Sequence, residues 1–357
     1  MRVEIPLHRY TYAICERISY NKFFREIIPD FFNKLFLILL PLTLTLTLSP
    51  SHPQSPRIRI MKKYIWVLFT ALAFGTMEIA LKIGGSAFTA LQLTFLRFLI
   101  GGLFLLPFAI HDLKKRAYHL TRRDFGYLCL LGFVNIVVSM TLFQLSVMHS
   151  NANLAAVLIS INPMFTMLFA HFIVNERFTL KKGIVLFICM TGLMFVANPF
   201  NLAEGNTVAG ILMGLGASIM FGLYTALSKR CVGRIGGMTV NSASFLIGAF
   251  FELLVLLGMQ EPVFSGICAD SIGVLLYVGF VVTGFGYFCF MRAIERGGAT
   301  TASYAFFIKP IIAMILAALI LGEAITWNIV LGIFIILCGC IYNVYEPKHA
   351  LDKTNAS

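Results

Sequence analysis

Long apolar runs, each close to the length of a membrane span, constrain this chain more than any other feature. From Tyr64 onward they follow one another with only short polar loops between them. A helix needs about 20 residues to cross the ~30 Å hydrocarbon core of a bilayer, and its backbone groups must be paired there. The runs lack the alternation of a membrane β-barrel. We therefore predict an all-α polytopic membrane protein with ten transmembrane helices, at residues 64–83, 89–110, 125–147, 152–174, 181–199, 207–228, 240–258, 271–292, 299–321 and 325–345.

Composition agrees with a membrane protein. Hydrophobic residues make up 59% of the chain and charged residues only 12%, with a mean hydropathy of +0.86. The net charge of +12 lies mainly in short loops between apolar runs, so we expect no nucleic-acid partner. The eight cysteines show no CxxC spacing and the histidines no ligand-spaced cluster. We therefore expect neither a metal site nor a cofactor.

The placement of basic residues predicts the orientation. Lysines and arginines lie before the first run and after the second, fourth, sixth, eighth and tenth runs. The alternate loops contain none: 148–151, 200–206, 259–270 and 322–325. Only Lys82, at the end of the first run, breaks this alternation. The positive-inside rule then predicts a multi-pass inner-membrane protein with both termini cytoplasmic, residues 346–357 forming a cytoplasmic tail.

Residues 1–60 differ from the rest of the chain. A mixed polar-aromatic segment, a Leu-Thr repeat and a Pro/Ser/Arg stretch precede Met61-Lys62-Lys63. We expect translation to begin at Met61, which would leave residues 1–60 outside the protein. A cleaved targeting segment or an extra membrane anchor around residues 31–48 is the alternative.

A repeat with an offset of 147 residues divides the remainder into residues 61–199 and 206–345. Matched residues fall in several runs: Phe74-Gly75 with Phe221-Gly222, Lys82 with Lys229, Gly132 with Gly279, Phe143 with Phe290, Pro163 with Pro310 and Glu176 with Glu323. Gly183 and Gly332 match at 149 instead, which indicates two residues gained in the last loop. Each copy has five runs, an odd number, so the second copy should be inverted in the bilayer. Inverted repeats are typical of alternating-access transporters.

Motifs of catalysis are missing from the sequence. It contains no GxSxG, HExxH or P-loop pattern and no carboxylates at catalytic spacing. A membrane enzyme would also need polar residues clustered at one membrane face. We therefore expect a protein that is not an enzyme; a channel is a further alternative to a carrier.

The sequence resembles the EamA domain in both halves. The residues that carry the likeness are Phe74-Gly75 followed by Lys82, Arg97, and the Pro–Glu–Gly pattern at Pro163, Glu176 and Gly183, which returns at Pro310, Glu323 and Gly332. Two tandem EamA domains imply the drug/metabolite transporter superfamily. The resemblance covers residues 61–345. It implies a ten-helix carrier whose helices one to four and six to nine line a central cavity, and it implies no particular substrate.

Four charged residues fall deep inside the predicted spans: Glu78, Arg97, Glu252 and Lys309. Such residues cost about 2.5–3.5 kcal/mol each on insertion and normally face a cavity or a partner. Glu78 and Lys309 lie at similar predicted depths, so we expect them to bind substrate or a coupling ion, with a purely structural ion pair as the alternative. Arg97 and Glu252 are candidates for a second, structural ion pair.

Polar residues add to this candidate site. The repeat matches Lys309 to Asn162 and Glu78 to Thr225. The two copies therefore differ at positions where a substrate or coupling ion would make the site asymmetric. Tyr224, Tyr304 and Asn135 are further candidates for hydrogen bonds to a ligand, although each is more often a helix–helix contact. We interpret Glu176 and Glu323 as structural, and expect Pro163 and Pro310 to kink their helices.

These observations predict a secondary transporter that moves a small polar metabolite across the inner membrane. An amino-acid-like zwitterion suits a Glu78/Lys309 pair; proton-coupled export of apolar or cationic drugs is the alternative. The expected partners are a small-molecule substrate and the lipid bilayer.

Overall fold

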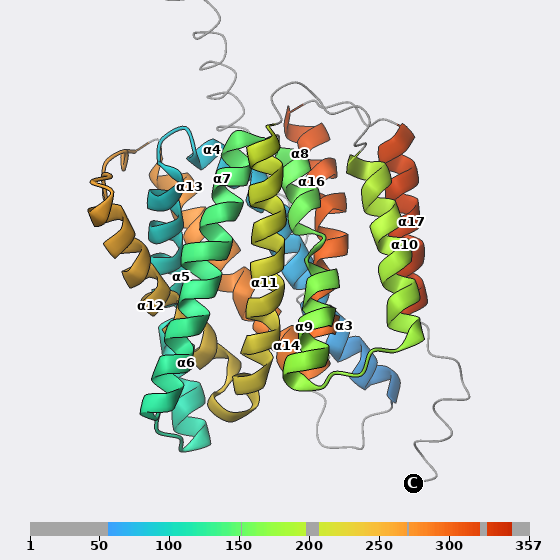
Figure 1. The fold of residues 1–357 in the computed structure, drawn as a ribbon, viewed down its shortest axis with the longest axis horizontal. Helices are drawn as coiled ribbons and strands as arrows, with labels where there is room; N and C mark the ends of the chain where they lie inside the picture. Colours follow the sequence, from blue (N-terminus) through green and yellow to red (C-terminus); the bar gives the residue numbers. More distant parts are fainter. Residues whose placement is uncertain (1–55, 151, 198–206, 270, 322–326, 345–357) are drawn as a thin grey trace, which may run out of the picture.

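The computed structural model describes residues 56–150, 152–197, 207–269, 271–321 and 327–344. Most of residues 1–60, Glu323 and the tail at 346–357 therefore lie outside the described residues. The regular elements of the described part are all helices (Figure 1). Its elements are α3 (Pro56–Gly75), α4 (Met77–Gly84), α5 (Ala90–Arg116), α6 (Arg122–Gly132), η2 (Phe133–Met140), α7 (Thr141–His149), α8 (Ala152–Ile159), α9 (Asn162–Val174), α10 (Leu180–Ala197), α11 (Val208–Ile235), α12 (Gly237–Gly258), α13 (Ile272–Leu276), η3 (Tyr277–Gly286), α14 (Tyr287–Gly297), α15 (Ala299–Ser303), α16 (Ala305–Leu321) and α17 (Trp327–Val344).

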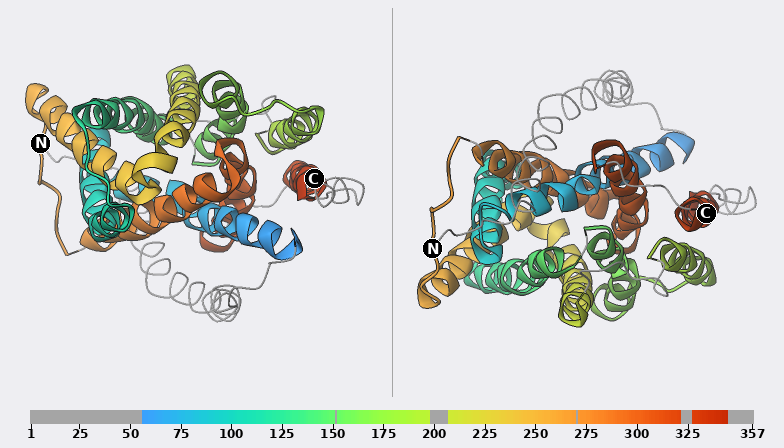
Figure 2. Two further views of the ribbon diagram at one scale, coloured as in Figure 1. Left: turned by 90° about the horizontal axis from the view of Figure 1, so that it is seen from below. Right: turned by 90° about the horizontal axis from the view of Figure 1, so that it is seen from above.

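Eight helical segments of the described chain are long and apolar enough to cross a membrane. They correspond to the predicted spans one to four and six to nine. The segments expected as spans five and ten are α10 and α17, which are 18 residues each and pack side by side at one end of the molecule (Figures 1 and 2). A polytopic membrane protein is thus the architecture, while membrane crossing by α10 and α17 stays a prediction.

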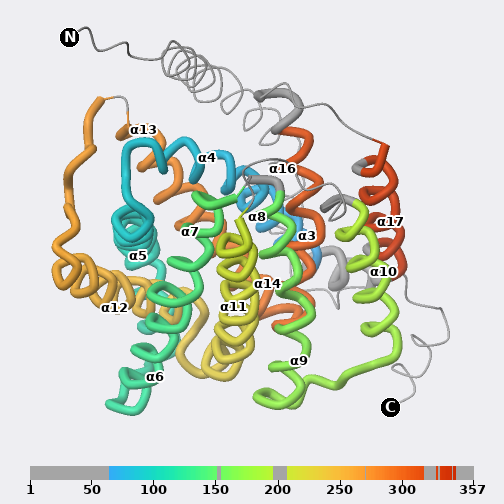
Figure 3. The backbone as a smooth tube through the Cα atoms, turned by 45° about the horizontal axis from the view of Figure 1, so that its top comes forward, coloured from blue at the N-terminus to red at the C-terminus, as the bar shows by residue number. Residues whose placement is uncertain are grey.

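Several spans are broken into shorter pieces, as the tube in Figure 3 shows where α8 leads into α9. The prolines do not both act as expected. Pro163 lies in the first turn of α9, where a missing N–H leaves no hydrogen bond unmade, and the break precedes it. Pro310 lies inside α16, while the break in its span comes earlier, at Tyr304. In both copies the break therefore precedes the proline, and a kink at the proline itself stays a prediction.

The third and eighth spans each contain a π-helical segment, η2 and η3. Both follow or include the matched glycines Gly132 and Gly279, so the feature belongs to both copies of the repeat. Apolar periodicity does not distinguish a π-helix from an α-helix over eight to ten residues, and we did not predict it.

Close contacts between helices are repeated in the two copies with the same 147-residue offset. A Cβ built on Gly75 would lie 2.7 Å from the Cβ of Ile312, and one built on Gly222 would lie 2.8 Å from the Cβ of Phe165. Each residue of the first contact is 147 positions from a residue of the second. This reciprocity is the mark of a two-fold relation between the copies.

Two lysines matched by the repeat also make equivalent hydrogen bonds. The Lys82 ammonium donates to the carbonyl of Val147 at 3.1 Å, and the Lys229 ammonium donates to the carbonyl of Ile294 at 3.1 Å. Each lysine thus binds carbonyls near the C-terminus of a helix, α7 or α14, where cations are favoured. Lys82 breaks the alternation of basic and non-basic loops, and its hydrogen bonds at the end of α7 explain why a lysine is tolerated there.

The same offset extends to α10 and α17. Gly192 approaches Ile336, and Gly339 approaches Cys189, again with 147 between the matched positions. The two-residue gain predicted for the last loop is therefore wrong for the packing of these helices. The identity that suggested it joined glycines that do not correspond in space.

Candidate functional site

Glu78 owes its position to a break in the first span. Helix α3 ends at Gly75, and α4 starts at Met77 with Glu78 in its first turn, where a carboxylate is favoured by the helix dipole. At the break, the Thr76 hydroxyl donates to the carbonyl of Ala73 and accepts a 2.8 Å hydrogen bond from Tyr277 of η3. The matched helix of the second copy, α11, is continuous. The break is thus specific to the copy that carries the glutamate.

Lys309, on α16, forms an ion pair with Glu78. The side chains of lysine and glutamate are 0% and 1% exposed, so the pair is closed off from solvent. The lysine ammonium also lies over two aromatic faces, 5.2 Å from the ring centre of Phe143 and 5.6 Å from that of Phe306. Opposite charge on one side and ring faces on the other stabilise a cation that has left water.

A cluster of aromatic rings adjoins this pair. Its members, all buried, are Phe74, Phe221, Tyr287, Phe290 and Phe306, whose rings contact one another, and Phe143, which lies beside Lys309. Phe306 contacts Phe74, Phe221 and Phe290 at ring separations of 5.2–5.9 Å. Two matched pairs of the repeat, Phe74 with Phe221 and Phe143 with Phe290, supply four of these rings. Those identities were a signal in the sequence that our prediction used only to find the repeat.

Arg97 and Glu252 do not make the direct ion pair proposed for them. Both side chains are fully buried, and Glu252 is near enough to Arg97 to interact through space. The Glu252 carboxylate instead accepts a 2.8 Å hydrogen bond from Thr141, while Arg97 donates to the sulfur of Met77 at 3.8 Å and lies 4.7 Å from the ring centre of Phe98. Glu78 and Tyr287 are also within electrostatic range of Arg97. The arginine therefore belongs to the surroundings of the Glu78/Lys309 pair.

Asn162 and Thr225, the residues that the repeat matches to Lys309 and Glu78, form hydrogen bonds within their own helices. Asn162 accepts from Thr166 at 2.9 Å on its own helix, and its side-chain N–H₂ has no partner among the described residues. Thr225 donates to the carbonyl of Phe221, one turn earlier. Both side chains are fully buried. Each copy therefore carries a buried charge where the other is neutral: Glu78 in the first copy is matched to Thr225 of the second, and Lys309 in the second is matched to Asn162 of the first.

The remaining polar candidates are dispersed. The Tyr224 hydroxyl donates to Asn241 at 2.8 Å, which ties α11 to α12. Tyr304 stacks on Phe307 and packs in a separate cluster with residues of α10 and α17. Asn135 lies buried in η2. The structure does not gather Tyr224 and Tyr304 around the ion pair.

Glu176 has a structural position. Its carboxylate accepts from the backbone N–H of Ala299 at 2.8 Å and from the Thr300 hydroxyl at 2.6 Å, at the start of α15. Lys182 lies 4.0 Å away. A residue that follows α9 in the first copy thus caps a helix of the second.

Comparison with known proteins decides what this architecture is. The sequence profile of the EamA-like transporter family matches residues 61–198 and again 208–345. The chain belongs to the EamA-like transporter family. It is therefore a member of the drug/metabolite transporter superfamily and a multi-pass membrane protein.

Bacterial proteins of similar sequence support this assignment. An "Uncharacterized transporter" of Clostridium kluyveri is 38% identical over 299 residues, which cover 82% of this chain and 96% of the relative. YoaV of Bacillus subtilis, also named an uncharacterized transporter, is 25% identical over 288 residues, covering 80% of this chain and 98% of its own. PagO of Salmonella typhimurium is 25% identical over 282 residues, covering 76% and 92%.

One solved crystal structure shares the fold of the transporter. It has a TM-score of 0.64 at 16% sequence identity and covers 79% of this chain and 96% of that one. At this identity the likeness concerns the fold alone. The names of the relatives give no substrate, so the chemistry of transport must come from the buried residues.

Proposed function

We propose that this protein is a secondary transporter of a small polar metabolite, with an amino-acid-like zwitterion as the favoured substrate class. The buried Glu78/Lys309 ion pair carries this proposal. It joins the first copy of the repeat to the second, and both of its charges have neutral counterparts in the other copy. Movement of one copy against the other would expose it alternately to the two sides of the inner membrane.

Charge balance favours the zwitterion. An isolated charge is costly in a dry interior, whereas paired charges compensate each other. A substrate ammonium would replace Lys309 beside Glu78, and a substrate carboxylate would replace Glu78 beside Lys309. The site then carries no net charge with or without its substrate, so both states can cross the closed intermediate.

The aromatic rings beside Lys309 support the alternative substrate class. Ring faces stabilise organic cations, and Glu78 could exchange a proton for such a cation. That mechanism requires Lys309 to lose its partner when the glutamate is protonated. The electroneutral zwitterion avoids this cost.

Exchange of the two charges tests the proposal. In proteoliposomes we would measure uptake of a panel of amino acids and organic cations by the full chain and by Glu78→Lys/Lys309→Glu. A structural ion pair survives inversion, whereas a substrate site would present each charge to the wrong end of the zwitterion. We expect stable protein and at least a tenfold loss of uptake, on the scale of one lost charge-assisted contact.

Two further variants complete the test. Glu78→Gln separates the substrate classes, because it should abolish zwitterion binding but abolish only proton-driven uptake for a drug carrier. Arg177→Gln, at an exposed arginine far along the chain from the site, is the matched control. Amino-acid uptake that is unchanged in both Glu78→Gln and the charge-inverted variant would refute the zwitterion site.

A further inference from the structure

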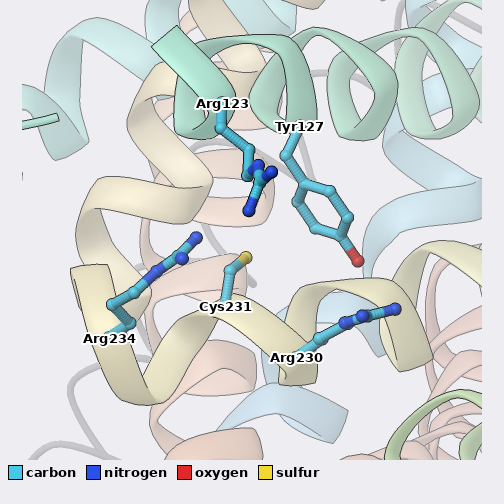
Figure 4. Close-up of a pocket in the computed structure, with 5 residues that line it drawn as sticks. All are labelled: Arg123, Tyr127, Arg230, Cys231 and Arg234. Atoms are coloured by element: carbon cyan, nitrogen blue, oxygen red, sulfur yellow. The ribbon is translucent and has the colours of Figure 1, made fainter. Parts of the chain in front are cut away.

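A basic pocket lies between α6 and α11 (Figure 4), and neither Glu78 nor Lys309 lines it. Its volume is about 360 Å³. Arg123 and Tyr127 line it from α6, and Arg230, Cys231 and Arg234 line it from α11. In Figure 4 the guanidinium groups of Arg123 and Arg234 approach the thiol of Cys231, while Arg230 extends below the Tyr127 hydroxyl.

The pocket carries unneutralised positive charge. Arg234 pairs with Asp124, and that carboxylate also accepts a 2.8 Å hydrogen bond from Tyr118, which raises the pKa of the Tyr118 hydroxyl. Arg123 and Arg230 have no acidic or hydrogen-bonding partner among the described residues. Three guanidinium groups against one carboxylate leave two positive charges facing the pocket.

Apolar residues continue from this charged end along both helices. On α6, Arg123, Tyr127 and Leu130 follow at four- and three-residue spacing, so they share one face. Leu130 is 46% exposed and Phe133, close to that face, is 48% exposed. On α11, the half-buried Leu227 and Leu223 continue the stripe from Arg230 in the same way. Positive charge, a tyrosine and then exposed apolar surface match a phospholipid from headgroup to acyl chain.

We propose that this pocket binds the headgroup of an anionic phospholipid, with its acyl chains along Leu130 and Phe133. A soluble anion would use the charged end alone and would leave the apolar stripe without a role. The starts of α3 and α6 and the ends of α9 and α11 lie at the same end of the molecule (Figure 1). This end carries most basic loops, which corresponds to the cytoplasmic leaflet in the orientation proposed above.

The lipid would bridge the two copies of the repeat, because α6 belongs to the first and α11 to the second. The second copy of the repeat does not keep these arginines, since the residues matched to Arg123, Arg230 and Arg234 are Asp270, Ile83 and Ala87. An anionic headgroup would therefore hold the helices together at one end only.

Native mass spectrometry of the purified full chain tests this inference. The protein would be titrated with phosphatidylglycerol, with phosphatidylcholine as the neutral lipid and with inorganic phosphate as the soluble anion. We expect saturable binding of phosphatidylglycerol, about tenfold weaker or more in Arg123→Gln/Arg230→Gln, because each basic residue near an anionic headgroup adds to the affinity. Arg123→Lys/Arg230→Lys should restore most of it.

A control variant at another exposed arginine completes the test. Arg177→Gln removes an exposed arginine from another loop and should leave phosphatidylglycerol affinity unchanged. Equal affinity in the double glutamine variant and this control would overturn the proposal, as would displacement of the lipid by excess inorganic phosphate. Should the double variant not purify, Arg230→Gln alone is judged by the same comparison.

Discussion

At the scale of single residues, charge buried in this protein is compensated in different ways. Lys309 has a carboxylate and two ring faces, Glu252 has a hydroxyl donor, and Arg97 has a sulfur, a ring and more distant carboxylates. The sequence predicted these three residues and Glu78 as buried charges, because a charge inside an apolar run is visible. It paired Arg97 with Glu252 wrongly, because helix depth does not give the direction of a side chain.

The Glu78/Lys309 pair should behave as a unit in stability measurements. Lys309→Gln alone leaves a buried carboxylate unpaired and should reduce the free energy of unfolding by about 3 kcal/mol. Glu78→Gln/Lys309→Gln removes both charges and should cost much less. Unfolding of the purified proteins in one detergent, arranged as a double-mutant cycle, measures the coupling. Additive effects of the two exchanges would contradict the ion pair.

At the scale of elements, glycine contacts set where helices cross. Gly75 lets α3 approach α16 at Ile312, and Gly222 lets α11 approach α9 at Phe165. The sequence predicted the helices from the length of their apolar runs and the repeat from matched residues. The breaks at Thr76 and Tyr304 and the two π-helices depend on packing between spans, which no local pattern encodes.

Alanine at these glycines should therefore be destabilising. Gly75→Ala would force the helices apart, at a cost of about 1–3 kcal/mol, and Gly222→Ala should cost a similar amount. Gly126→Ala, in α6, is the control, since a Cβ there meets nothing within 4 Å. It should be neutral or stabilise by about 0.5–1 kcal/mol. Thermal unfolding of the three variants in detergent distinguishes crowding from a general effect of helix propensity.

At the scale of the whole molecule, the two-fold relation makes matched residues act at opposite ends. Lys82 and Lys229 bind the C-terminal ends of α7 and α14 in the same way. The matched identities in the sequence predicted this relation.

Removal of each lysine should favour opening at its own end. With alternating access, Lys82→Ala should increase labelling of cysteines introduced near the outer end of the central helices, and Lys229→Ala should increase it near the inner end. A lost hydrogen bond of about 1 kcal/mol corresponds to a shift of roughly fivefold in the populations. Equal labelling changes at both ends in either variant would count against a paired role.

The orientation can be read from a native thiol. Cys268 is an exposed cysteine in a loop without lysine or arginine. With both termini in the cytoplasm this loop faces outward, so a membrane-impermeant maleimide should label intact cells and should not label Cys268→Ser cells. Labelling of Cys268 that is seen only after permeabilisation would reverse the orientation.

The π-helical segments η2 and η3 mark where the third and eighth spans can lose one residue without rotating the rest of the helix. Deleting one residue from an α-helix rotates everything beyond it by about 100°, because the helix has 3.6 residues per turn. A wider π turn holds a surplus residue, and its loss returns the segment to α geometry with both flanking faces kept in register. Family members with one residue fewer at this point would therefore keep the same helix faces, and insertions elsewhere in these spans would not.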